Sequence, residues 1–110
     1  MSYQHKELAS GRWSQLSFLE QMANIGSEVE RALSWRAKGN AAYSQKAVDR
    51  ALELMDLTLS AASTFPQRKE LTRVREVVVD YFLGSNEFGS SDEAWRKYFL
   101  NFTYALRKKY

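Results

Sequence analysis

The side chains with the strongest intrinsic chemistry are nearly absent from this sequence. His5 is the single histidine in 110 residues, and there is no cysteine. Zinc sites and thiol nucleophiles need these side chains, and diiron bundles join carboxylates to histidines as Glu-x-x-His on facing helices. His5 precedes every strong helical segment. The sequence therefore predicts no catalytic residue, no metal, no cofactor and a protein that is not an enzyme.

Two carboxylates and two arginines are the remaining candidates for chemistry. Glu53 and Asp56 are three residues apart and would point the same way from a helix, as a carboxylate site for Mg²⁺ requires, although such pairs are also common on solvated helices. Arg36 and Arg75 lie at or near apolar helix faces, where a cation is costly unless it is paired. We expect structural ion pairs rather than an anion pocket. Possible partners are Glu28, Glu53, Asp56, Glu76 and Asp80.

Helix start and stop signals divide the chain into four segments. Capping boxes of the form S/T-x-x-E/Q begin at Ser17, Thr64 and Ser90, and each predicts the start of a helix. Gly39 supplies the left-handed residue that ends a helix, and Asn40 can cap the next helix at once. No stretch alternates with period two, so we expect no strand. The predicted helices span about 17–38, 41–60, 65–83 and 91–107.

Four helices of similar length with short connections favour an all-α, antiparallel up-down-up-down four-helix bundle. The composition, 45% hydrophobic and 26% charged, is typical of a globular domain, and residues 1–110 are expected to form one domain. Residues 84–89 read as the longest internal loop. Residues 5–10 are predicted to form a short helical turn or an irregular segment, with Trp13 and Leu16 packing onto the bundle as a lid.

Helical projection separates a predicted core from apolar residues that point outward. Large aromatic residues of the fourth segment fall on its inner face, where core filling is their usual role. Apolar residues on the outside of several helices indicate a second buried surface, which self-association explains best. The alternative is that they are scattered and half exposed, or covered by the lid. The predicted interface residues are Trp35, Leu57, Leu100 and Tyr104, and we place the interface first at Leu100 and Tyr104.

The positive charge of the chain is concentrated in its second half. The net charge is +3, and residues 1–60 carry seven basic and seven acidic side chains against nine and six in residues 61–110. The terminal basic run can bind phosphates or cap the carbonyl end of a helix. The alternative function is therefore a weak RNA-binding module. Its candidate residues are Arg68, Lys69, Arg73, Arg96, Lys97, Arg107, Lys108 and Lys109.

The sequence gives no sign of a membrane or of export. No apolar run approaches the roughly 20 residues that span a bilayer, and the first residues lead into no signal-peptide core. The absence of cysteine agrees with a reducing compartment. We expect a cytoplasmic protein with no membrane partner.

Several stretches form a recognisable pattern: HKELA at 5–9, Trp13, LS at 16–17, EQMANIGSEV at 20–29, VREV at 74–77, DYF at 80–82 and WRKYF at 95–99. Over most of its length the chain thereby resembles a family of small uncharacterised prokaryotic helical proteins. By shape it is also similar to the bundle proteins encoded in ribosomal-RNA intervening sequences, which implies ring-like oligomers and RNA contact. It is similar in shape to HEPN domains too, whose RNases use an Arg-x4-6-His motif. No arginine precedes His5, so that likeness implies no such nuclease.

Overall fold

The computed structural model describes residues 11–61 and 64–109. These ranges contain a short 3-10 helix, four α-helices and no strand, which confirms the predicted all-α fold. The helices begin within one residue of the predicted starts. Their bounds are Trp13–Gln15 for η2, Phe18–Ala37 for α1, Ala41–Ala61 for α2, Phe65–Leu83 for α3 and Asp92–Lys109 for α4.

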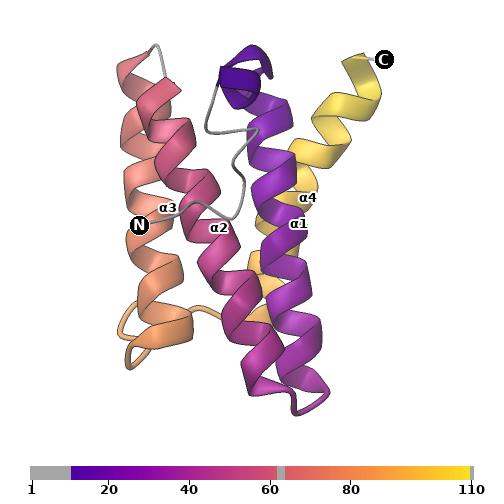
Figure 1. Ribbon diagram of the computed structural model, residues 1–110, viewed down its shortest axis with the longest axis vertical. Helices are drawn as coiled ribbons and strands as arrows, with labels where there is room; N and C mark the ends of the chain where they lie inside the picture. Colours follow the sequence, from indigo (N-terminus) through magenta and orange to yellow (C-terminus); the bar gives the residue numbers. More distant parts are fainter. Residues whose placement is uncertain (1–10, 62–63, 110) are drawn as a thin grey trace.

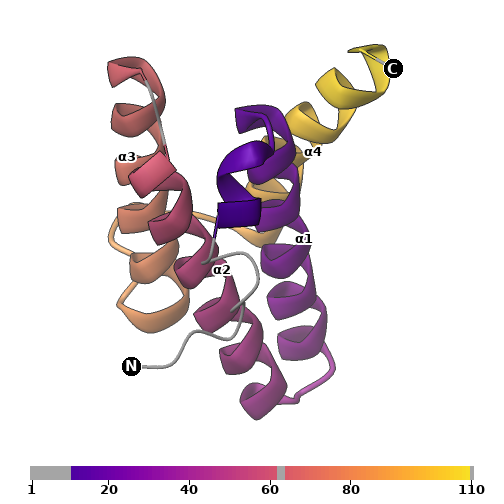
Figure 2. The same ribbon diagram turned by 45° about the horizontal axis from the view of Figure 1, so that its top comes forward.

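The four helices form an antiparallel bundle in which α1 has the central place. In Figure 1, α1 and α3 run in one direction and α2 and α4 in the other. The most extensive packing is between α1 and α2, followed by that between α1 and α4, while α2 also packs on α3. Helix α3 stands at one side and the C-terminal end of α4 leans away at the other, in both views (Figures 1 and 2). Helices α3 and α4 therefore meet mainly through long side chains.

The start and end of α1 and the start of α2 follow from local features that the sequence predicts. The Ser17 side chain accepts from the backbone N–H of Glu20, and the Glu20 carboxylate accepts from the Ser17 N–H, so the capping box is complete. Gly39 ends α1 with a φ of 79°, in the left-handed region. Asn40 then caps α2, because its Oδ1 accepts from the Tyr43 N–H at 3.0 Å.

The capping box predicted at Ser90 is wrong by one residue. Helix α4 begins at Asp92, and the residue that caps it is Ser91, whose Oγ accepts from the Ala94 N–H at 3.1 Å. Ser90 belongs to the preceding loop, because the Asn86 side chain accepts from its N–H at 2.8 Å and donates to its C=O at 3.0 Å. Either of the two adjacent serines could have capped the helix, and the hydrogen bonds of Ser90 within the loop leave Ser91 as the cap.

Asp80 organises the loop between α3 and α4. Its carboxylate accepts from the Glu87 N–H at 2.8 Å and from the Phe88 N–H at 3.0 Å. Its backbone C=O accepts from the N–H groups of Gly84 and Asn86, each at 3.1 Å. Asp80 was a predicted partner for an arginine, and that expectation is wrong because its carboxylate satisfies the loop backbone. The loop is thus fixed by hydrogen bonds although its sequence has no periodic pattern.

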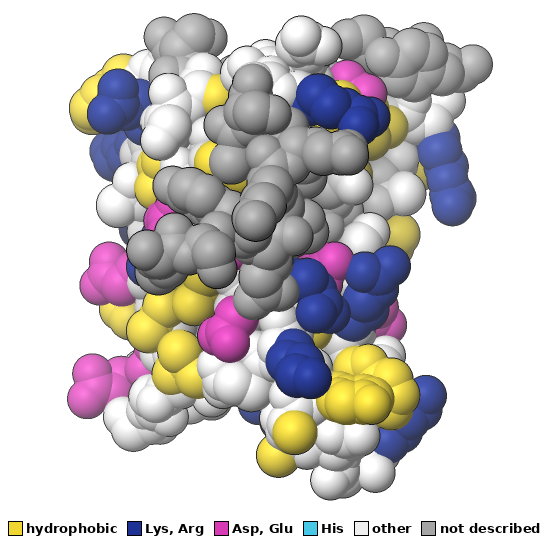
Figure 3. Space-filling model, viewed as in Figure 1, with side chains coloured by type: hydrophobic (Ala, Val, Ile, Leu, Met, Phe, Trp, Pro, Cys, Tyr) yellow, Lys and Arg dark blue, Asp and Glu magenta, His cyan; other side chains and the backbone are white. Residues whose placement is uncertain are grey.

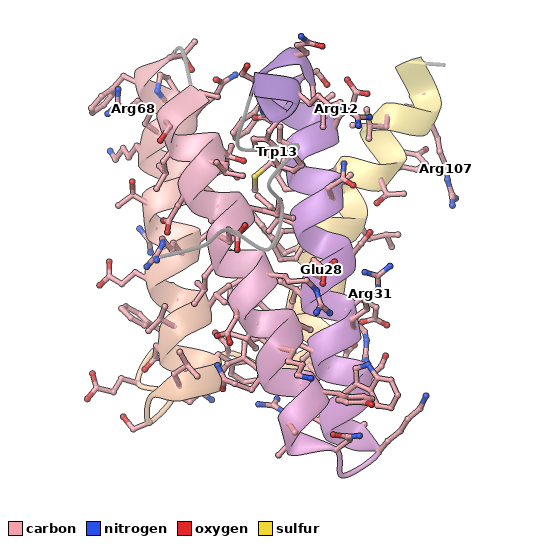
Figure 4. All side chains as sticks on the ribbon, in the orientation of Figure 1. Arg12, Trp13, Glu28, Arg31, Arg68 and Arg107 are labelled. Atoms are coloured by element: carbon pink, nitrogen blue, oxygen red, sulfur yellow. The ribbon has the colours of Figure 1, made fainter. Side chains whose placement is uncertain are left out.

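A lid residue completes the core between α1 and α2, as predicted for Trp13 (Figure 4). The Trp13 ring is buried, and its indole N–H donates to Thr58 Oγ1 of α2 at 2.8 Å. Its C=O accepts from the Gln21 side-chain amide of α1 at 2.9 Å. Leu16 is half-buried against the same core, which confirms its predicted role. The turn predicted over 5–10 lies outside the described residues.

We expect Thr58→Val to lower the free energy of unfolding by about 1–3 kcal/mol, because valine keeps the shape of threonine but leaves the buried Trp13 N–H without an acceptor. Urea unfolding followed by circular dichroism measures this. Thr72→Val is the matched control, because Thr72 also donates to the C=O four residues earlier, at 2.7 Å, but is exposed. Its effect should stay within about 0.5 kcal/mol. Equal losses in the two variants would contradict the assigned role of Thr58.

Candidate functional site

Arg36 joins three helices at the end of the bundle where α4 begins. Its Nη2 donates to Asp92 Oδ1 at 2.8 Å, and its guanidinium lies over the rings of Tyr81, at 4.7 Å, and Phe82, at 5.0 Å. The Tyr81 hydroxyl donates to the same Asp92 carboxylate. The expected ion pair for Arg36 is present, but Asp92 was not among its predicted partners. Sequence spacing could not reveal this pair because Arg36 and Asp92 are far apart in the chain.

The contacts of this cluster shift two pKa values in opposite directions. The hydrogen bond from Tyr81, followed by that from Arg36, lowers the pKa of Asp92 although partial burial opposes the change. Burial, followed by the hydrogen bond to Asp92, raises the pKa of Tyr81. Asp92 is therefore held as an anion and Tyr81 as a neutral phenol. The proton between these two groups therefore stays on the Tyr81 hydroxyl, which agrees with a structural role for the cluster.

The other carboxylate and arginine candidates also bind one another. Arg75 of α3 donates to Asp56 of α2 from Nε at 2.8 Å and from Nη2 at 3.2 Å, which confirms the expected ion pair. Asp56 is thereby occupied, and this argues against the Mg²⁺ pair with Glu53. Within 11–61 and 64–109 no three histidine, aspartate or glutamate side chains come together as metal ligands would.

Glu28 carries a buried carboxylate that links α1 to α2. Its two oxygens accept from Arg31 at 2.7 Å and from Arg50 at 2.9 Å, and its side chain is only 8% exposed. Figure 4 shows Glu28 and Arg31 together on α1. The expectation that Glu28 would pair with Arg36 or Arg75 is wrong, because arginines closer to it neutralise it. Sequence reasoning missed both partners, although the i, i+3 spacing to Arg31 was a signal.

A groove runs between α1 and α4, on the surface where the strongest interface candidates lie. The groove has a volume of about 800 Å³, and Leu100 is one of the residues that line it. The side chains of Leu100 and Tyr104 are 60% and 58% exposed, as predicted. In the packing of α1 on α4, Gly26 lies against Phe99: a Cβ atom on Gly26 would stand 2.8 Å from the Phe99 Cβ. This contact leaves room for no larger residue at that point.

The other two interface candidates are not part of this surface. Leu57 is half-buried against the main core, so its predicted outward position is wrong. Trp35 is half-buried in an edge-to-face contact with Tyr43, with 4.9 Å between ring centroids. Lys38 and Lys46 lie over these two rings. Figure 3 shows hydrophobic side chains beside lysines and arginines at this end of the molecule. The four candidates therefore do not form one patch.

The basic side chains of the second half are divided between distant surfaces. Arg68 on α3 and Arg107 on α4 project from opposite sides of the molecule (Figure 4). Arg96 donates to Glu30 at 2.8 Å and lines the α1–α4 groove with Lys97, and Lys108 lies over the Tyr104 ring. The side chain of Lys109 lies outside the described residues. The predicted RNA-binding set is therefore not a single surface.

One part of that set does form a continuous stripe, on the outer face of α3. Arg68, Lys69 and Arg73 line a shallow groove together with Phe65, whose side chain is 75% exposed. None of the three basic residues forms an ion pair within the described ranges. Sequence analysis identified the cations but not Phe65. The helical spacing of 65, 68, 69 and 73 was the available signal.

The comparisons with known proteins identify no relative. No family model, no curated protein and no solved structure matches the chain. The resemblance to a family of small prokaryotic helical proteins stays a prediction. None of the helices in the described ranges combines the length and apolar character that crossing a membrane requires.

The lowered pKa of Asp92 makes a directional prediction for the pH dependence of stability. A carboxyl whose pKa is lowered on folding stabilises the protein above its unfolded pKa of about 3.9, and the contribution is lost as the pH falls below that value. Asp92→Asn should therefore be less stable than the wild type at pH 7, with the difference shrinking toward pH 2. Urea midpoints measured across this range test it. Glu93→Gln, an exposed neighbour in the first turn of α4, should show a smaller difference at every pH.

Proposed function

We propose that this protein is a non-enzymatic, self-associating helical bundle that acts as an adaptor or scaffold, and that a second copy docks on the α1–α4 surface. The observation that carries the proposal is the exposed apolar strip of Leu100 and Tyr104. These residues are four positions apart on α4, so their side chains lie on consecutive turns of one helix face. Exposed apolar surface of this kind is typical of protein contact sites.

The groove beside the strip offers a second copy a site for its own exposed residues. Ala23 of α1 and Leu100 of α4 are apolar residues of its lining that are not buried. A side chain such as Leu100 of a second copy would lose its contact with water on entering the groove. Each buried side chain of that size contributes on the order of 2 kcal/mol.

Charges around the groove favour a two-fold arrangement of identical chains. Acidic Glu30 and Glu93 and basic Arg31, Arg96 and Lys97 all line it. In a two-fold interface the same patch meets itself in reversed orientation, so residues of opposite charge can face each other. A rim of a single charge would repel its own copy. The mixed charge therefore supports a second copy as the occupant.

The internal polar contacts support a protein without catalytic activity. Arg36, Asp92 and Tyr81 satisfy one another, and so do Arg75 and Asp56. A general acid or base needs a proton that it can exchange with a substrate near neutral pH. The lowered pKa of Asp92 and the raised pKa of Tyr81 move both groups away from that range.

Light scattering coupled to gel filtration tests the proposal. At micromolar concentration we expect the wild type to have a mass above 12.7 kDa, and Leu100→Lys to weaken association by about tenfold or more, because an unpaired charge would be buried. Phe88→Lys is the matched control: Phe88 is similarly exposed, at 56%, but lies in the loop before α4. A wild type that stays at 12.7 kDa, or equal effects of the two variants, would refute this function.

A second candidate function is the binding of single-stranded RNA by the outer face of α3. The exposed Phe65 ring favours it, because it lies next to three cations that form no ion pair with other described residues. Aromatic rings on which bases stack, flanked by basic side chains, are the usual elements of single-strand binding. The stripe is short, and Glu76 lies at one end of it, so we expect weak binding.

Fluorescence anisotropy with a labelled oligouridylate tests this second function. Phe65→Ala should weaken binding about fivefold through the loss of a stacked base, and Arg68→Gln should weaken it through the loss of a positive charge. The affinity of the wild type should fall about tenfold between low and physiological salt. Arg107→Gln is the control, because Arg107 lies on the opposite side of the molecule (Figure 4). Binding that ignores salt, or that depends equally on Arg107, would exclude the α3 face.

A further inference from the structure

A separate cavity lies between α3 and α4, on a different face from the α1–α4 groove. It has a volume of about 350 Å³, within the range of small-molecule sites. The apolar part of its lining comes from Val74 and Val77 of α3 and from Ala94, Trp95 and Tyr98 of α4. The cavity exists because α3 and α4 meet through side chains rather than through close backbone packing. It is large enough for one or two fused rings.

Two aromatic rings give the cavity a defined shape. The Trp95 and Tyr98 rings stand at 88° to each other, with 6.1 Å between their centroids. A planar aromatic body can stack on one of these rings while its edge meets the face of the other, and both arrangements are favourable. The Tyr98 hydroxyl donates to Glu70 at 2.6 Å, which fixes the ring. Burial and this hydrogen bond raise the pKa of Tyr98, so the hydroxyl stays protonated.

The indole N–H of Trp95 has no hydrogen-bond acceptor among the described residues. Trp95 is only 6% exposed, and this N–H is closed to solvent. A buried N–H without an acceptor costs about 1–3 kcal/mol. Trp13, by contrast, is similarly buried but donates to Thr58. Because this N–H is closed to solvent, the Trp95 indole is part of the cavity lining but does not bond a ligand there.

The charge at the edge of the cavity indicates which acceptor fits best. Arg73 lines the cavity and forms no ion pair within the described ranges. Glu70, the acidic residue of the lining, already accepts from Tyr98. A carboxylate is an anion that can accept two parallel hydrogen bonds from a guanidinium, so it complements Arg73.

We propose that the α3–α4 cavity binds a small aromatic monocarboxylate, whose ring packs among Val74, Trp95 and Tyr98 and whose carboxylate is bound by Arg73. This site is independent of self-association, because it shares no lining residue with the α1–α4 groove. It is also distinct from the outer α3 stripe at Phe65, with which it shares only Arg73.

Titration with 2-naphthoate, followed by the indole N–H resonances in ¹H–¹⁵N NMR spectra, tests the site. We expect the Trp95 resonance to shift and the Trp13 resonance to stay, because the Trp13 N–H is already bonded to Thr58. The Trp95→Phe variant assigns the resonance and should bind about fivefold more weakly, because phenylalanine offers the ligand a smaller ring. The proposal is wrong if 2-naphthoate at about 1 mM does not shift the Trp95 resonance, because the dissociation constant would then be well above about 1 mM.

A pair of exposed arginines separates specific binding from general attraction of anions. Arg73→Gln should weaken 2-naphthoate about threefold, as expected for a partly solvated charge, and should leave the neutral 2-naphthamide unchanged. Arg68→Gln, which lies five residues earlier on α3 and outside the cavity, should change neither. Both residues are exposed, so both variants should fold.

Equal losses in the two variants, or naphthamide binding as tightly as naphthoate to the wild type, would overturn the proposed carboxylate site. Binding by Leu100→Lys should match the wild type, which separates this test from that of self-association.

Discussion

The close contact between Gly26 and Phe99 determines how the rest of the bundle is arranged. Because Gly26 has no side chain, α4 approaches α1 until the Phe99 ring touches the α1 backbone. Helix α4 is thereby held mainly by α1, and α3 is left to reach it across a wider gap. Aromatic side chains fill part of that gap and leave the α3–α4 cavity. The same placement turns Leu100 and Tyr104 toward solvent.

Polar contacts between helices fix the positions that this apolar packing allows. Glu28 joins α1 to α2, Arg75 joins α3 to α2, and Arg36 joins α1 to α4. A buried carboxylate such as Glu28 is tolerated only with its cations, so it selects one alignment of α1 and α2 more than it adds stability. The exposed pairs add little energy individually. Hydrophobic burial therefore supplies the stability, and the ion pairs supply the register.

Local features of the fold could be predicted from the sequence, and features that depend on distant contacts could not. Ser17, Gly39 and Asn40 act on their own neighbours, so their helix boundaries follow from spacing alone. Leu57 was misplaced because projection of a single helix does not show how far the core extends around it, and Leu57 packs against the main core. The pairing of Arg36 with Asp92 depends on how the chain ends meet in space.

The candidate surfaces were predictable in the same limited sense. Exposure of Leu100 and Tyr104 follows from the period of one helix, and it was predicted correctly. The α3–α4 cavity depends on the distance between two helices, which no residue pattern specifies.

The contact of Trp13 with Thr58 also affects when the lid can fold. The two residues are 45 positions apart, so during synthesis the lid has no acceptor until nearly all of α2 has left the ribosome. Trp13 thus meets its hydrogen-bond acceptor only after α1 and most of α2 have been made.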